Sequence, residues 1–296
     1  MFERAARASI APPDGSLMLA TRIVTALVLV SVVLAALFLL PPWAWGAVAL
    51  AGITVAAGEW ASLAGYGRPA WLLFVAGAVL IGVNLLFSPL AGFAGGWPDG
   101  VVLAVCGPAT LFWLLVVPAW LRGQWQPRSP LLLAIVGWLV LIAAWVAVVE
   151  LQARSPWLAL AAMAIVWVAD IAAYFTGRAF GRRKLAPAIS PGKTWEGVWG
   201  ALVAVAVYAL ALVPLAQRAG YAGEVSAFAV GGWLLLALVL AALAVAGDLF
   251  ESLQKRHAGV KDSGTLLPGH GGVLDRIDAL LSALPLAALA ALAFLR

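Results

Sequence analysis

Acidic, hydroxyl and basic side chains recur at helical spacing near the C-terminus of the chain. Asp248, Ser252 and Lys255 are spaced i, i+4 and i+7, and Glu251 lies close to the same face. If the apolar helix that precedes them continues this far, one face carries an acid, a hydroxyl and a cation. Such a face is suited to binding a metal ion or a phosphate group.

A second pair of acids follows a glycine-rich turn. Asp275 and Asp278 are spaced i and i+3 at the start of the last apolar segment, where capping of the helix is their simplest role. The preceding PGHGG turn, with Gly271 and Gly272, permits close backbone approach to a ligand and can fold this helix back against the Asp248 helix. Carboxylates from two helices, without cysteine ligands, are hard oxygen donors that suit Mg²⁺ rather than zinc.

Basic side chains surround this predicted metal site. Lys255, Arg256, Lys261 and Arg276 all belong to the same stretch of chain. Acids, a hard metal and clustered cations are the groups that phosphoryl transfer uses, because its catalysis consists mostly of positioning and charge neutralisation. His270 fits two roles, an acid–base group or a hydrogen-bonding residue of the turn.

An earlier region also carries candidate substrate-binding groups. Asp170 lies within an apolar span, where an ionisable side chain costs at least about 2.5–3.5 kcal/mol unless it has a partner or a wet cavity. A functional role is therefore the default interpretation. Tyr174 and Gly177 follow at i+4 and i+7, so they share the helix face of Asp170.

The basic loop that follows contains SPGKTWEG. Lys193 can act as a point charge for phosphate, and the hydroxyls of Ser190 and Thr194 as hydrogen-bond donors. The GKT sequence is not a P-loop, because Pro187 stands where that motif needs a glycine and no strand is predicted before it.

Membrane helices must position these motifs. The chain has 296 residues, 65% of them hydrophobic and 10% charged, with a mean hydropathy of +1.04. These values exclude a soluble domain and predict an all-α polytopic integral membrane protein. Nine apolar stretches are long enough to span a bilayer, at approximately 17–40, 43–64, 71–88, 101–121, 130–149, 157–176, 198–216, 227–250 and 275–295.

The distribution of basic residues predicts the orientation. With nine spans, only Arg154, Arg218 and Arg296 of the eighteen lysines and arginines fall on one side. The positive-inside rule then places the N-terminus and the polar loops 177–197 and 251–275 in the cytoplasm, in a protein of the cytoplasmic (inner) membrane. The net charge of +5 reflects this topology rather than nucleic-acid binding.

The two halves of the chain differ in polarity. Residues 1–150 are predicted to be mainly transmembrane scaffold, and residues 151–296 the catalytic region. Glu59, in the first half, is expected at the membrane interface rather than in the site. Tryptophans near predicted helix ends are expected to form an interfacial belt. They include Trp43, Trp60, Trp71, Trp97, Trp120, Trp157 and Trp199.

The stretch from Ser252 to Asp278 resembles the signature of the phosphatidate cytidylyltransferases, the CDP-diacylglycerol synthases. The upstream stretches GDLFES, DxxAYxxGRxFG and SPGKTWEG are also similar to that family, so the resemblance covers Asp170 to Asp278. Across residues 1–150 it rests on hydropathy alone. Within the signature the matching residues are Ser252, Lys255, Arg256, Lys261, Asp262, Pro268, His270, Gly271, Gly272, Asp275, Arg276 and Asp278.

The resemblance implies transfer of the cytidylyl group from CTP to phosphatidate, giving CDP-diacylglycerol and pyrophosphate for phospholipid biosynthesis. It implies Mg²⁺ as cofactor, with Asp248 and Asp275 as its carboxylate ligands, and it allows a potassium ion beside the magnesium. It also implies membrane lipids as partners and a homodimer as the assembly.

Three other activities fit the same residues. A CTP-dependent polyprenol or dolichol kinase shares the nucleotide and the membrane setting. A phospho-sugar transferase acting on a polyprenyl phosphate would also use intramembrane acids with Mg²⁺. A transporter could use Asp170 and Asp248 as ion sites, but a dense array of cations and the lack of paired interrupted helices in the two halves disfavour transport.

Overall fold

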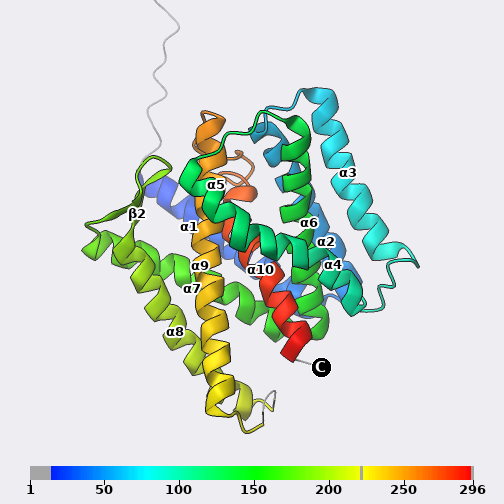
Figure 1. Cartoon of the computed structure of the whole chain (residues 1–296), viewed down its shortest axis with the longest axis vertical. Coiled ribbons are helices and arrows are strands. Elements are labelled where there is room, and N and C mark those ends of the chain that lie inside the picture. Colours follow the sequence, from blue (N-terminus) through cyan, green and yellow to red (C-terminus); the bar gives the residue numbers. More distant parts are fainter. Residues whose placement is uncertain (1–14, 221–222, 295–296) are drawn as a thin grey trace, which may run out of the picture.

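A computed structural model of the chain describes residues 15–220 and 223–294. These residues form helices and one small antiparallel hairpin (Figure 1). In chain order the elements are α1 Gly15–Leu39, α2 Pro42–Leu63, α3 Arg68–Phe87, α4 Asp99–Leu111, the π-helical turn η1 Phe112–Val116, α5 Val117–Gly123, α6 Pro130–Arg154, α7 Pro156–Phe180, β1 Lys184–Ala186, β2 Ser190–Thr194, α8 Trp195–Arg218, α9 Ala227–His257 and α10 Leu274–Phe294.

Eight helical segments are long and apolar enough to cross a membrane, which confirms an all-α polytopic membrane protein. They are α2, α3, the continuous segment Asp99–Gly123, and α6 to α10. The remaining predicted span, 17–40, falls on α1, whose segment Val24–Leu39 is apolar but shorter than a span. The count of nine and the orientation therefore stay predictions. Arg4, Arg7 and Arg296, on which the orientation partly depends, lie outside the described residues.

Two helices extend further than hydropathy predicts. α7 continues to Phe180, and α9 continues to His257 instead of ending near residue 250. The face that carries Asp248 and Lys255 is therefore helical throughout, as the spacing predicts. α9 ends where Gly259 takes a positive φ of 71°, a backbone conformation that terminates helices and favours glycine.

The loop predicted at 177–197 is more ordered than expected. α7 occupies its start, α8 its end, and β1 pairs with β2 between them, so the expected absence of a strand is wrong. The GKT sequence spans Gly192 to Thr194 within β2, not in a loop after a strand, so the structure agrees with rejecting a P-loop. Two backbone N–H groups, of Arg182 and Arg183, donate to the Glu196 carboxylate at 3.1 and 3.2 Å and close the base of the hairpin.

α6 and α10 form the centre of the bundle. α10 packs against α9, α6, α4 and α7, while α8 packs against α7 and α9 at one edge (Figure 1). Water does not drive helices together inside a membrane, so close packing and interhelical hydrogen bonds must do so. The indole N–H of Trp145 in α6, for example, donates to the carbonyl of Gly46 in α2 at 2.9 Å.

Several tryptophans predicted for the interfacial belt lie inside the bundle instead. Trp60, Trp97 and Trp120 are buried. The indole N–H of Trp60 donates to the carbonyl of Leu133 at 3.1 Å, and that of Trp97 to the carbonyl of Leu85 at 2.8 Å. An indole suits either setting, because its one donor is satisfied by a carbonyl as well as by interfacial water. Trp43, Trp157 and Trp199 are exposed, as a belt requires.

The orientation can be tested by cysteine labelling. α8 and α9 are antiparallel neighbours, so Thr265, after α9, and Glu224, before it, mark opposite ends of the bundle. In a Cys106→Ala background, which removes the single buried cysteine, we expect Thr265→Cys to react only with reagent that enters the cytoplasm. Glu224→Cys is the matched control and should react with an impermeant reagent in intact cells. Labelling of Thr265→Cys from outside would invert the topology.

Candidate active site

Asp248 lies where α9 passes the hairpin. Its Oδ2 forms an ion pair with Lys193 Nζ of β2 at 2.6 Å, and Ser252 Oγ donates to its Oδ1 at 3.3 Å. Further along α9, Arg256 Nε donates to the carbonyl oxygen of Ile189 at 3.2 Å. Side chains of α9 therefore hold the hairpin, and the lysine that the sequence assigns to phosphate lies against the aspartate that it assigns to metal.

Two more aspartates face the same region. Asp170 of α7 is within range of charge–charge interaction with Asp248, Lys193 and Arg276. Asp278 of α10 interacts in the same way with Asp248 and Lys193. Three helices thus contribute one aspartate each to an acidic cluster, defined here as Asp170, Asp248 and Asp278, and the hairpin contributes Lys193 beside it.

Gly247 sets the distance between two helices of this cluster. A Cβ at this position would lie 2.6 Å from the carbonyl oxygen of Asp278 and 2.5 Å from Oγ of Ser282. The Ser282 hydroxyl donates to the carbonyl of Leu243 at 2.7 Å, across the same interface. A small residue and a buried hydroxyl are what close helix packing in a membrane requires.

Lys255 joins α9 to α10 through a buried ion cluster. Its Nζ lies 2.5 Å from Oε2 of Glu251 and 2.6 Å from Oδ1 of Asp275, and the three side chains are 13%, 4% and 4% exposed. One ammonium group thus lies between two carboxyl groups from different helices. The side chain of Lys255 is turned into the protein, toward carboxylates, rather than onto an open phosphate-binding surface.

The second oxygen of Asp275 organises the signature turn. Oδ2 accepts hydrogen bonds from the backbone N–H and the hydroxyl of Ser263, at 2.9 and 3.0 Å, and from the N–H of Gly272 at 2.8 Å. Gly271 has a φ of 79°, and a Cβ on it would lie 2.7 Å from this oxygen. The glycines therefore permit close backbone approach, here to a side chain of the protein. The turn does bring the Asp275 helix against α9, as predicted.

The carboxylates form a continuous series rather than one preassembled metal site. Asp248 is paired with Lys193 and Asp275 with Lys255. Glu251 also interacts with Asp275, Asp278 interacts with Asp248, and Glu251 and Asp278 interact with one another. Among the described residues, no group of three or more His, Cys, Asp or Glu side chains is spaced to hold a metal ion. The donor set nevertheless fits Mg²⁺ by its chemistry, since every acid in it offers hard carboxylate oxygens.

The residues of the α7–α8 connection have separate positions. Tyr174 is exposed, and its hydroxyl accepts a hydrogen bond from Arg178 Nη1 at 3.2 Å. Thr194 is buried, and its hydroxyl oxygen accepts the N–H of Gly197 at 3.2 Å, which caps α8. Ser190 is half-buried at the start of β2. Of the three, Thr194 has an evident structural role.

The predicted residues of the signature turn are more open. Lys261 and Asp262 are exposed, and Arg276 is exposed in the first turn of α10. His270 is half-buried, and its Nδ1 lies 3.4 Å from the carbonyl oxygen of Pro268, two residues earlier in the turn. That contact fits a hydrogen-bonding residue of the turn. Lys261 and Arg276 remain accessible to an anionic substrate.

Sequence reasoning missed Glu59 and Ser263 in this region, and it gave no role to Glu251, which the spacing places close to the Asp248 face. Glu59 was expected at the membrane interface, but it is 9% exposed and its Oε2 accepts a hydrogen bond from Ser263 Oγ at 3.1 Å. The signal was present, because an ionisable residue in an apolar helix is a candidate functional residue wherever it occurs. Hydropathy could not show which partner it meets.

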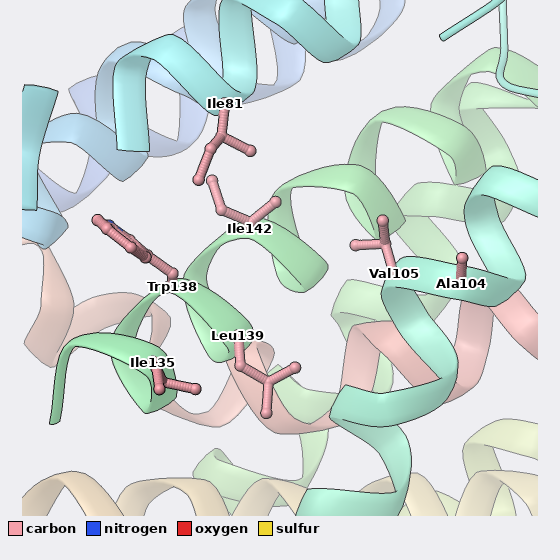
Figure 2. Close-up of a pocket in the computed structure, with 7 residues that line it drawn as sticks. All are labelled: Ile81, Ala104, Val105, Ile135, Trp138, Leu139 and Ile142. Atoms are coloured by element: carbon pink, nitrogen blue, oxygen red, sulfur yellow. The ribbon is translucent and has the colours of Figure 1, made fainter. Parts of the chain in front are cut away.

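An apolar hollow of about 330 Å³ lies away from these groups, between α3, α4 and α6. Figure 2 shows Ile135, Trp138, Leu139 and Ile142 of α6 around it, with Ile81 of α3 opposite. Its lining offers no charged side chain for a nucleotide. The polar cluster at the α9–α10 junction, not this hollow, is the candidate active site.

Membrane-spanning helices here gather acids and cations at one end, an arrangement typical of a membrane enzyme of phosphoryl chemistry. A family model described as the cytidylyltransferase family matches residues 20–294. A phosphatidate cytidylyltransferase of Pseudomonas aeruginosa is 42% identical over 284 residues, covering 90% of this chain and 95% of the relative. One of Haemophilus influenzae is 37% identical over 286 residues, covering 90% and 96%. The chain belongs to the cytidylyltransferase family.

The role of Gly247 can be tested with a methyl group. Gly247→Ala would place its Cβ against the backbone of Asp278, so α9 and α10 must move apart, at a cost of about 1–3 kcal/mol for overpacking. We expect at least a 10-fold loss of turnover and a lower melting temperature in detergent. Gly231→Ala, on the same helix with nothing within 4 Å, is the control and should retain both. Wild-type turnover of Gly247→Ala would show that this spacing is not needed.

Proposed function

We propose that this chain transfers the cytidylyl group of CTP to phosphatidate, forming CDP-diacylglycerol and pyrophosphate for phospholipid biosynthesis. The observation that carries the proposal is the 42% identity over 90% of the chain to a protein named phosphatidate cytidylyltransferase. The candidate site supports it, because Asp248 and Asp275 each lie against a lysine, and acids with clustered cations are the groups that phosphoryl transfer uses.

The reaction requires that the two substrates be positioned correctly, but it does not require a strong general base. A phosphate oxygen of phosphatidate attacks the α-phosphorus of CTP, a new P–O bond forms, and the bond from that phosphorus to the β-phosphate oxygen breaks. The nucleophile is already an anion, so no proton has to be removed from it. Lys193, Lys261 and Arg276 would neutralise phosphate charge, and Ser190 and Ser252 would donate hydrogen bonds. His270 is not required as a base.

Mg²⁺ is the proposed cofactor, with Asp248, Asp275 and Asp278 as the residues that would hold it, and K⁺ beside it is proposed on the family resemblance. When bound, the metal would supply charge neutralisation to the phosphates of CTP. The physical basis of this proposal is the ion pairs that Lys193 forms with Asp248 and Lys255 with Asp275. Lys193 and Lys255 balance the same negative charge that a divalent cation would balance, so the acids favour a cation at this position.

The site is proposed to face the cytoplasm of an inner membrane, where CTP is available. The excess of basic residues at this end of the bundle supports that orientation. Phosphatidate would reach the cluster from the adjoining lipid, beside the exposed residues Asp170 and Tyr174 of α7. A homodimer is proposed on the family resemblance.

The function is tested by identifying the lipid product. Purified protein with labelled CTP, Mg²⁺ and phosphatidate should release labelled CDP-diacylglycerol, and excess EDTA should abolish the reaction. A polyprenol offered in place of phosphatidate should give no product. Phosphorylated polyprenol, or turnover that persists in EDTA, would favour another membrane phosphotransferase or a metal-independent site. Absence of any lipid product with the folded protein would favour transport.

The role of Asp275 is tested by a series of isosteric and truncated variants. Asp275→Asn keeps the size of the side chain but loses the anion that Lys255 and the turn surround, so turnover should fall on the order of 10³-fold or more. Lys261→Ala should weaken CTP binding with a smaller loss of turnover. The exposed residue Asp262 supplies the control, since Asp262→Asn should change least.

Each variant of this series is compared at matched levels of folded, membrane-inserted protein, because removal of a buried charge can also destabilise the fold. Near-normal turnover of Asp275→Asn at limiting Mg²⁺ would remove Asp275 from the metal site and leave it as a structural residue of the turn.

A further inference from the structure

We propose that Glu59 of α2 is a positioning residue for the reaction, which fixes the signature turn and the start of α10 and thereby holds Asp275 in place. The proposal rests on the proposed function only in naming Asp275 as a reacting group of the site. It assigns an active-site role to the N-terminal half of the chain, which the sequence presents as scaffold.

Three donors converge on the Glu59 carboxylate. Oε1 accepts the backbone N–H of Val273 at 3.0 Å, and Oε2 accepts the N–H of Leu274 at 2.7 Å and the hydroxyl of Ser263 at 3.1 Å. Two of these donors are backbone N–H groups at the start of α10, which have no partner within their own helix. Glu59 therefore caps α10 from another helix, with an anion at the positive end of its dipole.

The surrounding backbone is built around this carboxylate. A Cβ on Gly264 would lie 2.5 Å from Glu59 Oε1, and one on Gly272 would lie 2.6 Å from its Cδ. The turn thus wraps the side chain so closely that a Cβ at either position would displace the Glu59 carboxylate. With Glu59 9% exposed, water cannot readily replace the lost acceptor if the carboxylate is removed.

Ser263 connects Glu59 to Asp275. Its hydroxyl lies 3.1 Å from Glu59 Oε2 and 3.0 Å from Asp275 Oδ2, and one hydroxyl hydrogen can serve only one acceptor at a time. Its backbone N–H donates to Asp275 as well, at 2.9 Å. A shift of the turn away from Glu59 would move both donors that Ser263 offers to Asp275 and, through that carboxylate, the buried ammonium of Lys255.

The central variant is Glu59→Gln, which keeps the shape of the side chain. An amide offers one acceptor oxygen to three donors and points its own N–H groups at the others, so the turn must move. We expect kcat to fall on the order of 10²-fold, which is the cost of displacing a reacting group by about 1 Å. KM for phosphatidate should stay close to that of the wild type, because Glu59 does not face the lipid.

Glu150→Gln is the matched control. Glu150 is also buried, at 2%, and its Oε2 accepts the backbone N–H of Trp97 at 3.0 Å. Trp60, the neighbour of Glu59, donates a hydrogen bond to the carbonyl of Leu133 in α6. Glu150 lies 17 residues beyond Leu133 on the same helix, which is about 25 Å further along its axis. A buried glutamate that accepts a loop N–H, and whose Oε1 also pairs with Arg154 at 2.8 Å, is thus changed in the same way, far from the site. We expect a similar fall in melting temperature but a near-normal kcat.

Two more readouts separate positioning from stability. Cleavage by trypsin after the exposed residue Lys261 should be faster in folded Glu59→Gln than in folded Glu150→Gln. Ser263→Ala should lower kcat by itself, and in the Glu59→Gln background it should add little, because both residues act on the same contact. These measurements also remain informative if Glu59→Gln folds poorly, since Ser263→Ala removes the connection without removing a buried charge.

A normal kcat in folded Glu59→Gln, or losses of kcat that follow melting temperature equally in both glutamate variants, would overturn the proposal. Full additivity of Ser263→Ala and Glu59→Gln would overturn the connection through Ser263. The kcat of each variant is compared with that of the wild type, and both are measured for the lipid product that the wild type forms. A different product would therefore contradict the proposed function while leaving the comparison of Glu59 and Glu150 intact.

Discussion

The buried ion pair between Lys255 and Asp275 is the interaction on which the rest of the site depends. It joins the end of α9 to the start of α10, and the other oxygen of Asp275 collects the N–H groups of Ser263 and Gly272. Charges removed from water must be paired and hydrogen-bonded, since an uncompensated one costs several kcal/mol. Both helices and the turn must therefore be in place together for any of these groups to be satisfied.

The membrane determines how such a cluster can be built. Apolar burial gives helices no reason to associate within lipid, so the bundle relies on small residues, on hydroxyl groups such as Ser282, and on indole N–H donors. The same close packing at Gly247 places Asp248 beside Asp278. Gly247, which the helix packing requires, and Asp248, a residue of the candidate site, are therefore neighbours on α9. A substitution at one of these positions would also disturb the other.

Cytidylyl transfer suits an arrangement of this kind. Its reactants are anions, so an enzyme gains most by holding fixed charges at the right places rather than by moving protons. The hairpin contributes Lys193, the α9–α10 junction contributes the acids, and α2 contributes the carboxylate under the turn. A division into an N-terminal scaffold and a C-terminal catalytic region does not capture that last contact.

The sequence by itself determined the class of fold, the family and many of the residues that the structure brings together in the candidate site. Hydropathy predicts helices because an apolar segment in lipid must satisfy its backbone hydrogen bonds within itself. The spacing of Asp248, Ser252 and Lys255 alone places them on one helix face. Only the tertiary structure decided the partners: Lys193 against Asp248, Lys255 between Glu251 and Asp275, Trp60 inside the bundle, and Glu59 under the turn. Glu59 and Ser263 are 204 positions apart, and no local pattern records which of two distant helices will meet. Their contact is a property of the packed bundle, in which a buried carboxylate is stable only where donors from another segment reach it.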